Sequence, residues 1–249
     1  MNPNQPHHKV EVILDTAEKL YADTGAEALT VRLIAETAGV NLAAINYHFR
    51  SKDNLIKAML NRRLSPLHKE RLALLHHFTR AAGPDLSTEH IVAAILIPGI
   101  HRMSLASAPA YLERFYLRSA ADPTPAIRDP MQEAFGSISQ TFDDAFCRIN
   151  PADACHDVLM MVHIFFNAYA GSIANHNTLL LLQELMKMPH FTVASAVSRF
   201  ASVLSVRPLS GETVSNLRVS KIICDLEFIP ELAHFYTLGQ ATDISFHAL

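Results

Sequence analysis

Four side chains between residues 42 and 47 have the types and the spacing needed to read base edges in DNA. They are Leu42, Ala43, Asn46 and Tyr47. Their spacing of i, i+1, i+4 and i+5 places them on one face of any helix that this segment forms. Alanine and leucine side chains can contact a thymine methyl group, asparagine can pair bidentately with adenine, and a tyrosine hydroxyl can reach a phosphate. The face therefore suits insertion into a major groove.

The surrounding sequence predicts a helix-turn-helix that would hold this face. Thr30 can cap a first helix, and Gly39 stands where that helix must end and turn. Asn41 can cap the second helix, in which Ile45 and Phe49 form the side that we expect to be buried. The alternative from periodicity alone is a short helical hairpin whose polar face lies in solvent.

A local patch of cations accompanies this face. The net charge of −3 argues against a protein that coats nucleic acid with its whole surface, so DNA binding would depend on local charge. The patch consists of Arg32, His48, Arg50, Lys52, Lys57, Arg62 and Arg63. Our predicted phosphate contacts are Thr30, Arg32, Tyr47, His48 and Lys52, and Asn41 completes the predicted DNA-binding set.

The string AETAGVNLAAINYHFRSKDNLIKAML resembles the DNA-binding domain of TetR/AcrR-type transcriptional regulators. The resemblance rests on the Ala-Gly-Val turn, the run from Tyr47 to Phe49 and the Ser-Lys-Asp-x-Leu opening at Ser51, and it covers roughly residues 9–64. Many family members carry tyrosine where this chain has Asn46, so base contacts cannot be copied from a generic member. The resemblance implies a homodimeric regulator of a palindromic double-stranded DNA operator, most often a repressor that a small molecule releases.

The fold class that we expect is all-α, because the apolar periodicity is helical and strand alternation is not evident. We predict a helix-turn-helix domain over 1–64, with 1–8 as a flexible arm, and a helix break at Ser65-Pro66. Following the resemblance, 65–206 would be a helical ligand-binding and dimerisation domain, with helices near 152–175 and 192–205 pairing across the dimer. A C-terminal extension of unknown role would occupy 207–249.

The resemblance also implies an effector pocket in the second domain. The polar groups that could orient an effector there are His101, Arg102, Arg114, Tyr116, Arg118, His163 and Asn167. Each of them could equally be a surface charge or a core hydrogen-bonding group.

The sequence does not favour an enzyme. The 14 histidines show no metal-binding or catalytic spacing, so we predict no metal and no cofactor. The three cysteines have no framework spacing and are expected to be reduced, and the lack of a membrane-spanning run predicts a cytoplasmic protein. The remaining alternatives are an activator of the same fold, a helical interaction protein that has lost DNA binding, and a helical enzyme with an incidental hairpin.

Overall fold

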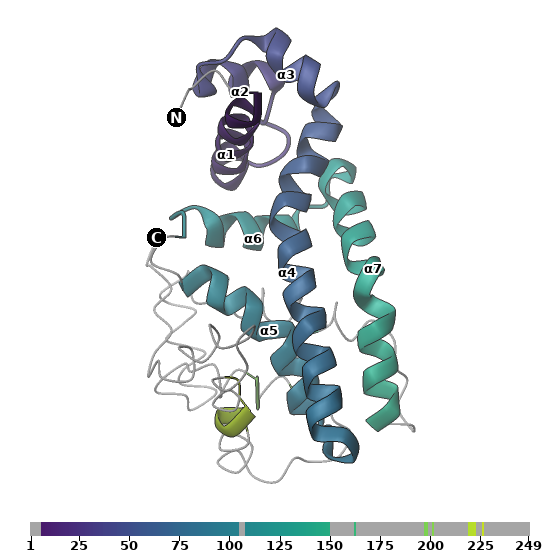
Figure 1. Cartoon of the computed structure of the whole chain (residues 1–249). Helices are drawn as coiled ribbons and strands as arrows, with labels where there is room; N and C mark the ends of the chain where they lie inside the picture. Colours follow the sequence, from purple (N-terminus) through teal and green to yellow (C-terminus); the bar gives the residue numbers. More distant parts are fainter. Residues whose placement is uncertain are drawn as a thin grey trace, which may run out of the picture. The chain divides into compact units, whose positions relative to one another are not determined.

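The computed structural model describes residues 6–104 and 108–149, together with positions 162, 197, 198, 201, 219–222 and 226 (Figure 1). The elements of the two long ranges are all helical, which confirms the predicted all-α class. In chain order they are α1 Pro6–Thr24, α2 Val31–Ala38, α3 Leu42–Phe49, α4 Lys52–Ala82, the short 3-10 helix η1 Gly83–Asp85, α5 Thr88–Ser104, α6 Leu112–Ala121 and α7 Pro125–Ile149.

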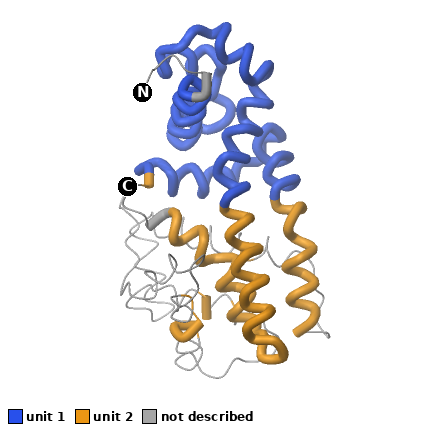
Figure 2. Tube along the Cα trace, in the orientation of Figure 1, with its two compact units in different colours: residues 1–66, 109–134 blue, residues 67–108, 135–249 orange. Residues whose placement is uncertain are grey.

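The chain divides into two compact units (Figure 2). Unit 1 contains Met1–Pro66 and Pro109–Ala134, and unit 2 contains Leu67–Ala108 and Phe135–Leu249. The segment with α6 and the start of α7 thus lies in the same unit as the helix-turn-helix, although the sequence prediction placed it in the second domain. This grouping reflects the packing of α6 on α1. The functional extents of the two domains stay a prediction.

The core of unit 1 holds the helices of the predicted helix-turn-helix in place. Apolar side chains at helical spacing meet in its interior, and each of the following is at most 1% exposed: Ile13, Ala17, Tyr21, Leu29, Ile34, Ile45, Leu55, Ile56 and Met59. Burial of a side chain of this size stabilises the fold by about 1.5–3 kcal/mol. α1, α2, α3 and the first turns of α4 are therefore fixed around one shared core.

Prolines do not end the helices where the sequence predicted. α4 continues through Pro66, so the predicted break at Ser65-Pro66 is wrong. Pro66 removes one backbone donor, but the neighbouring Leu64 and Leu67 are each only 2% exposed, and their packing outweighs that loss. α5 likewise contains Pro98, a residue type that often ends a helix, and runs past it to Ser104.

The proline-rich segment over residues 121–130 is mostly helical as well. The proline content of this segment is typical of a turn, but α7 begins at Pro125 and contains Pro130. Proline is well suited to the first helical position, because its missing N–H has no helical partner there. The Thr124 carbonyl accepts hydrogen bonds from Ile127 and Arg128, which closes the first turn.

Cys147 takes part in a disulfide bond, which corrects the expectation that all three cysteines are reduced. The other cysteines, Cys155 and Cys224, lie outside the described residues. Sequence spacing could not reveal the bond, because a disulfide requires two cysteines that the fold brings close together in space.

Several predicted features lie outside the described residues. They are the extension over 207–249 apart from positions 219–222 and 226, and the predicted dimerisation helices near 152–175 and 192–205 apart from positions 162, 197, 198 and 201. Residues 1–5 of the predicted flexible arm over 1–8 also lie outside the described residues, whereas residues 6–8 belong to α1, so the arm prediction is wrong for these three positions. Among the described residues, no helix is long and apolar enough to cross a membrane.

Candidate nucleic-acid interface

The turn between α2 and α3 is built by three capping interactions. The Thr30 hydroxyl accepts a hydrogen bond from the backbone N–H of Leu33 at 3.1 Å, which caps α2. Gly39 ends α2 at φ 65°, in the left-handed region that favours glycine. The Asn41 side-chain oxygen then accepts from the N–H of Ala43 at 2.8 Å and caps α3. The predicted roles of Thr30, Gly39 and Asn41 in the fold are confirmed.

The two faces of α3 separate as the sequence predicted. Ile45 and Phe49 are 1% and 8% exposed, so they anchor the helix in the core of unit 1. The opposite face is open, with Leu42 43% exposed, Tyr47 81% exposed, and Ala43 and Asn46 exposed as well. Two large hydrophobic side chains that are exposed on the same face of a helix indicate a surface that binds another molecule.

The predicted basic patch is smaller than its sequence suggests. Arg62 donates to Glu11, Asp15 and Glu18, and Arg63 donates to Glu18. Burial lowers the pKa of both guanidinium groups, but the negative charge of the fully buried Glu18, and the hydrogen bonds to it, outweigh this effect and raise the pKa. These two arginines therefore hold α4 against α1 within unit 1.

Three other cations of the patch also have partners. Lys57 pairs with Glu133 at 2.6 Å, and Arg32 pairs with Glu36 four residues along α2 at 2.9 Å. Both pairs are exposed, so each stabilises the fold by at most about 1 kcal/mol and a phosphate could displace the acid. The Lys52 ammonium donates to the backbone carbonyl of Ala26 at 2.8 Å.

Arg50 is the cation of the patch that is left for solvent or DNA. Its side chain is exposed and makes no hydrogen bond or ion pair with any other described residue. Its backbone ends α3 at φ 66° and ψ −39°, a conformation that is strained for a residue with a Cβ. The chain therefore bends at Arg50, directly after α3, and the Arg50 side chain is exposed at this bend.

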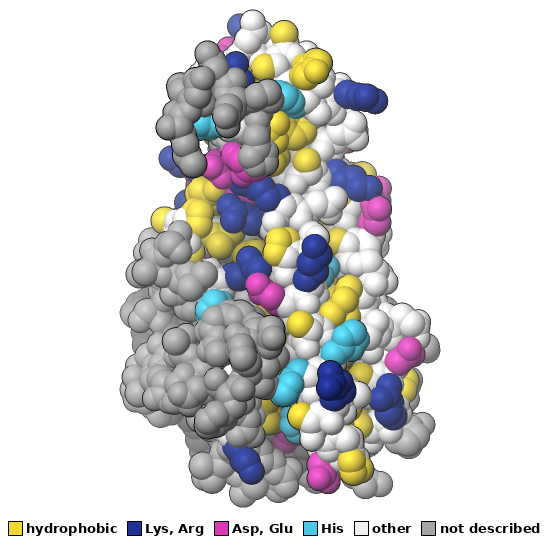
Figure 3. All heavy atoms as spheres, in the orientation of Figure 1, with side chains coloured by type: hydrophobic (Ala, Val, Ile, Leu, Met, Phe, Trp, Pro, Cys, Tyr) yellow, Lys and Arg dark blue, Asp and Glu magenta, His cyan; other side chains and the backbone are white. Residues whose placement is uncertain are grey.

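His48 lies beside the exposed face of α3 and is not part of it. It is half-buried, and its ring meets the edge of the Tyr47 ring with centroids 5.2 Å apart. On the face of the molecule shown in Figure 3, the described Lys and Arg side chains stand in small groups and do not form one continuous basic sheet. Any electrostatic attraction of DNA to this part of the molecule would therefore come from a few individual side chains and not from a broad basic surface.

The comparisons with known proteins agree with this geometry. Residues 13–59 match the family model for bacterial regulatory proteins of the tetR family. This segment is therefore a DNA-binding domain of the tetR type. Over 58 residues it is also 36% identical to the HTH-type transcriptional repressor KstR2 of Mycolicibacterium smegmatis. That match covers 23% of this chain and 28% of the relative's length, so it concerns the TetR-family DNA-binding domain alone.

A solved structure extends the likeness in fold. The putative TetR-family transcriptional regulator from Rhodococcus sp. superimposes with a TM-score of 0.50 over 81% of this chain and 98% of its own. The sequence identity is 18%, so this likeness concerns the fold.

The predicted effector residues do not form one group among the described residues. In unit 2, Arg102 pairs with Glu70, and His101 is half-buried. In unit 1, Arg114 pairs with Asp23 at 2.8 Å, and the Tyr116 ring packs edge-on against Phe115. The two remaining members of the predicted set, His163 and Asn167, lie outside the described residues.

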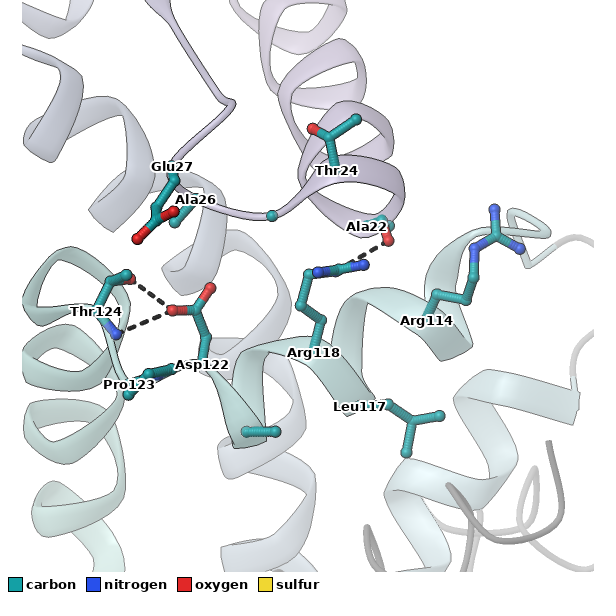
Figure 4. A pocket seen from close by; sticks show the side chains of 12 residues that line it. Ala22, Thr24, Ala26, Glu27, Arg114, Leu117, Arg118, Asp122, Pro123 and Thr124 are labelled. Atoms are coloured by element: carbon teal, nitrogen blue, oxygen red, sulfur yellow. Dashed lines mark hydrogen bonds between the residues drawn. The ribbon is translucent and has the colours of Figure 1, made fainter. Parts of the chain in front are cut away.

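Arg118 lines an open cleft within unit 1, and Arg114 is a second member of the predicted set that lies on this cleft (Figure 4). The cleft has a volume of about 540 Å³ and lies between the loop after α1 and the end of α6. Its lining comprises Ala22, Thr24, Gly25, Ala26, Glu27, Arg114, Leu117, Arg118, Ala121, Asp122, Pro123 and Thr124. Sequence reasoning missed this cleft, because its walls come from segments about ninety residues apart that carry no shared motif.

Proposed function

We propose that this chain is a transcriptional repressor that binds a palindromic operator as a homodimer and is released by a small-molecule effector. The observation that carries the proposal is the open face of α3, where Leu42, Ala43, Asn46 and Tyr47 are exposed while Ile45 and Phe49 fix the helix. The relative described as a repressor matches in this domain and supports the direction of the effect.

In the proposed complex α3 lies in the major groove. Asn46 would pair with an adenine, and the side chains of Leu42 and Ala43 would contact thymine methyl groups. Thr30, Arg32, Tyr47, His48 and Lys52 would contact phosphates and set the register of the helix. Asn41, at the start of α3, lies where its amide group can reach the same backbone while its oxygen caps the helix.

A dimer explains how eight-residue reading helices reach useful specificity. Two copies of α3 set about one helical turn of DNA apart, ~34 Å, would read two half-sites of a palindrome. The pairing would use the helices near 152–175 and 192–205. An effector would release the operator to the extent that it binds the non-matching dimer more tightly than the matching one.

The test is selection of bound sites from random duplex DNA, followed by the salt dependence of the selected site. We expect a palindromic sequence whose affinity falls steeply with salt, because each phosphate contact releases counterions. The Asn61→Ala variant, which removes an exposed amide from α4, should select the same sequence. Weak binding without a preferred sequence would contradict the proposal.

A further inference from the structure

The cleft of unit 1 contains two opposite charges that are not paired with each other or with any other charged residue that the structure describes. Arg118, from α6, is exposed and donates hydrogen bonds to two backbone carbonyls, that of Ala22 at 3.1 Å and that of Asp23 at 3.5 Å. Glu27, from the loop after α1, is exposed and makes no hydrogen bond or ion pair with any described residue. The two side chains extend from different walls of the same cleft (Figure 4).

The other charged groups of the cleft are satisfied within the protein. Arg114 is paired with Asp23. Asp122 accepts hydrogen bonds from the backbone N–H and the hydroxyl of Thr124 and from the hydroxyl of Tyr21. These bonds lower the pKa of Asp122 against the effect of burial, so its carboxylate is ionised and already engaged. Arg118 and Glu27 are left as the two charges of the lining that a ligand could pair.

From these charges we infer that the cleft binds a small zwitterion, whose anionic group pairs with Arg118 and whose ammonium group pairs with Glu27. A guanidinium prefers a carboxylate or phosphate oxygen to a neutral carbonyl, because the charged acceptor gives the stronger hydrogen bond. The side chains of Leu117, Ala121 and Pro123 supply an apolar wall for the part of the ligand that joins its two charges.

Binding at this site would change the hydrogen bonds that Arg118 donates to the end of α1. Ala22 and Asp23 belong to the last turn of α1, where the helix dipole favours a cation. The Arg118 guanidinium also covers the loop, since a Cβ built on Gly25 would lie 3.1 Å from its Nη1. A ligand anion would compete with these carbonyls for Arg118. Occupation of the cleft is therefore linked to the loop that connects α1 to α2.

The experiment is calorimetric titration of the full chain, without DNA, with the zwitterions γ-aminobutyrate, δ-aminovalerate and ε-aminocaproate. Caproate and hexylammonium serve as probes that carry a single charge. We expect saturable binding of at least one zwitterion, and binding weaker by about tenfold or more for both single-charge probes. Because no DNA is present, this result is independent of whether the chain is a repressor.

Variants assign the binding to the cleft. Arg118→Gln and Glu27→Gln should each weaken the zwitterion by about tenfold or more, whereas Arg80→Gln, which removes an exposed arginine outside the cleft, should not. Ala121→Phe fills the cleft from an exposed position and keeps the experiment decisive if Arg118→Gln does not fold. The inference is overturned if no zwitterion saturates the protein, if caproate binds as tightly as the zwitterions, or if affinity is unchanged in Glu27→Gln and Ala121→Phe.

Discussion

The Lys52 ammonium donates a 2.8 Å hydrogen bond to the backbone carbonyl of Ala26. This bond joins the first turn of α4 to the loop between α1 and α2. Lys52 therefore has a structural partner inside unit 1, in addition to the phosphate that we propose for it. An ammonium group has three donors, so the two roles are compatible.

Replacement of Lys52 should reveal both roles. We expect Lys52→Met to lower the free energy of unfolding by about 1–2 kcal/mol, because a charge-assisted hydrogen bond is lost. It should also weaken binding to all DNA sequences alike and flatten the salt slope. Urea unfolding and salt-dependent binding measure the two effects. Lys19→Met, at an exposed position of α1, is the control, and equal stability of the two variants would exclude the structural role.

Arg50 allows charge and backbone strain to be separated. Both Arg50→Ala and Arg50→Gly remove the guanidinium, so both should reduce the magnitude of the salt slope by about one. Only glycine relieves the strain at φ 66°, so Arg50→Gly should be more stable than Arg50→Ala by about 1 kcal/mol or more. Denaturant unfolding and binding at several salt concentrations test the two statements. Equal salt slopes for both variants and the wild type would show that Arg50 does not contact phosphate.

Asn46 is the predicted base reader, and its loss should change sequence preference. Asn46→Ala should relax the preference at one base pair of each half-site by about 1–3 kcal/mol, which is the usual discrimination of a bidentate contact. Its stability should hardly change, since the side chain is exposed. Repeating the site selection with Asn46→Ala and with Asn61→Ala measures this. An unchanged preferred sequence for Asn46→Ala would remove Asn46 from the set of base readers.

The parts of the site that were predictable from sequence are those fixed by neighbours along the chain. The caps at Thr30, Gly39 and Asn41 depend on contacts two to four residues away, and the faces of α3 follow from helical spacing. Burial of Ile45 and Phe49 follows from the same spacing, because the apolar side of a helix faces the core. Local sequence patterns are therefore sufficient to predict which side of α3 is exposed.

The parts that sequence did not reveal depend on tertiary contacts. Arg62 and Arg63 were counted as basic surface because their acidic partners stand more than forty residues away on α1. Pro66 was read as a helix end because local propensity does not include the packing of the buried leucines beside it. The same holds for the cleft, which exists only after α6 has packed on α1.

Among the polar residues of unit 1, we expect substitution of Glu18 to reduce the free energy of unfolding the most. It is fully buried and accepts hydrogen bonds from Arg62, Arg63 and Tyr111. Glu18→Gln would leave two guanidinium groups without this carboxylate, so we expect the free energy of unfolding to fall by about 3 kcal/mol. Asp15→Asn removes an exposed partner of Arg62 and should cost less than about 1 kcal/mol. Similar costs for the two variants in urea unfolding would contradict a special role for Glu18.

Tyr111 should make stability depend on alkaline pH. Burial, and then the charge of Glu18, raises the pKa of Tyr111 to about 12, above its ordinary value of about 10. Between these values the unfolded chain has lost a phenol proton that the folded chain retains, so the free energy of unfolding should fall as the pH rises.

Tyr111→Phe removes this proton, so its stability should decrease less than that of the wild type across the same window. The expected difference is of the order of 1 kcal/mol, reduced from the full shift because the tyrosine is partly exposed to solvent. Tyr21, whose pKa is also raised, is present in both proteins, so its contribution cancels in the comparison. Urea unfolding at about pH 9 and about pH 11 measures the difference. Parallel losses of stability in the two proteins would show that the pKa of Tyr111 is the same in the folded and the unfolded chain.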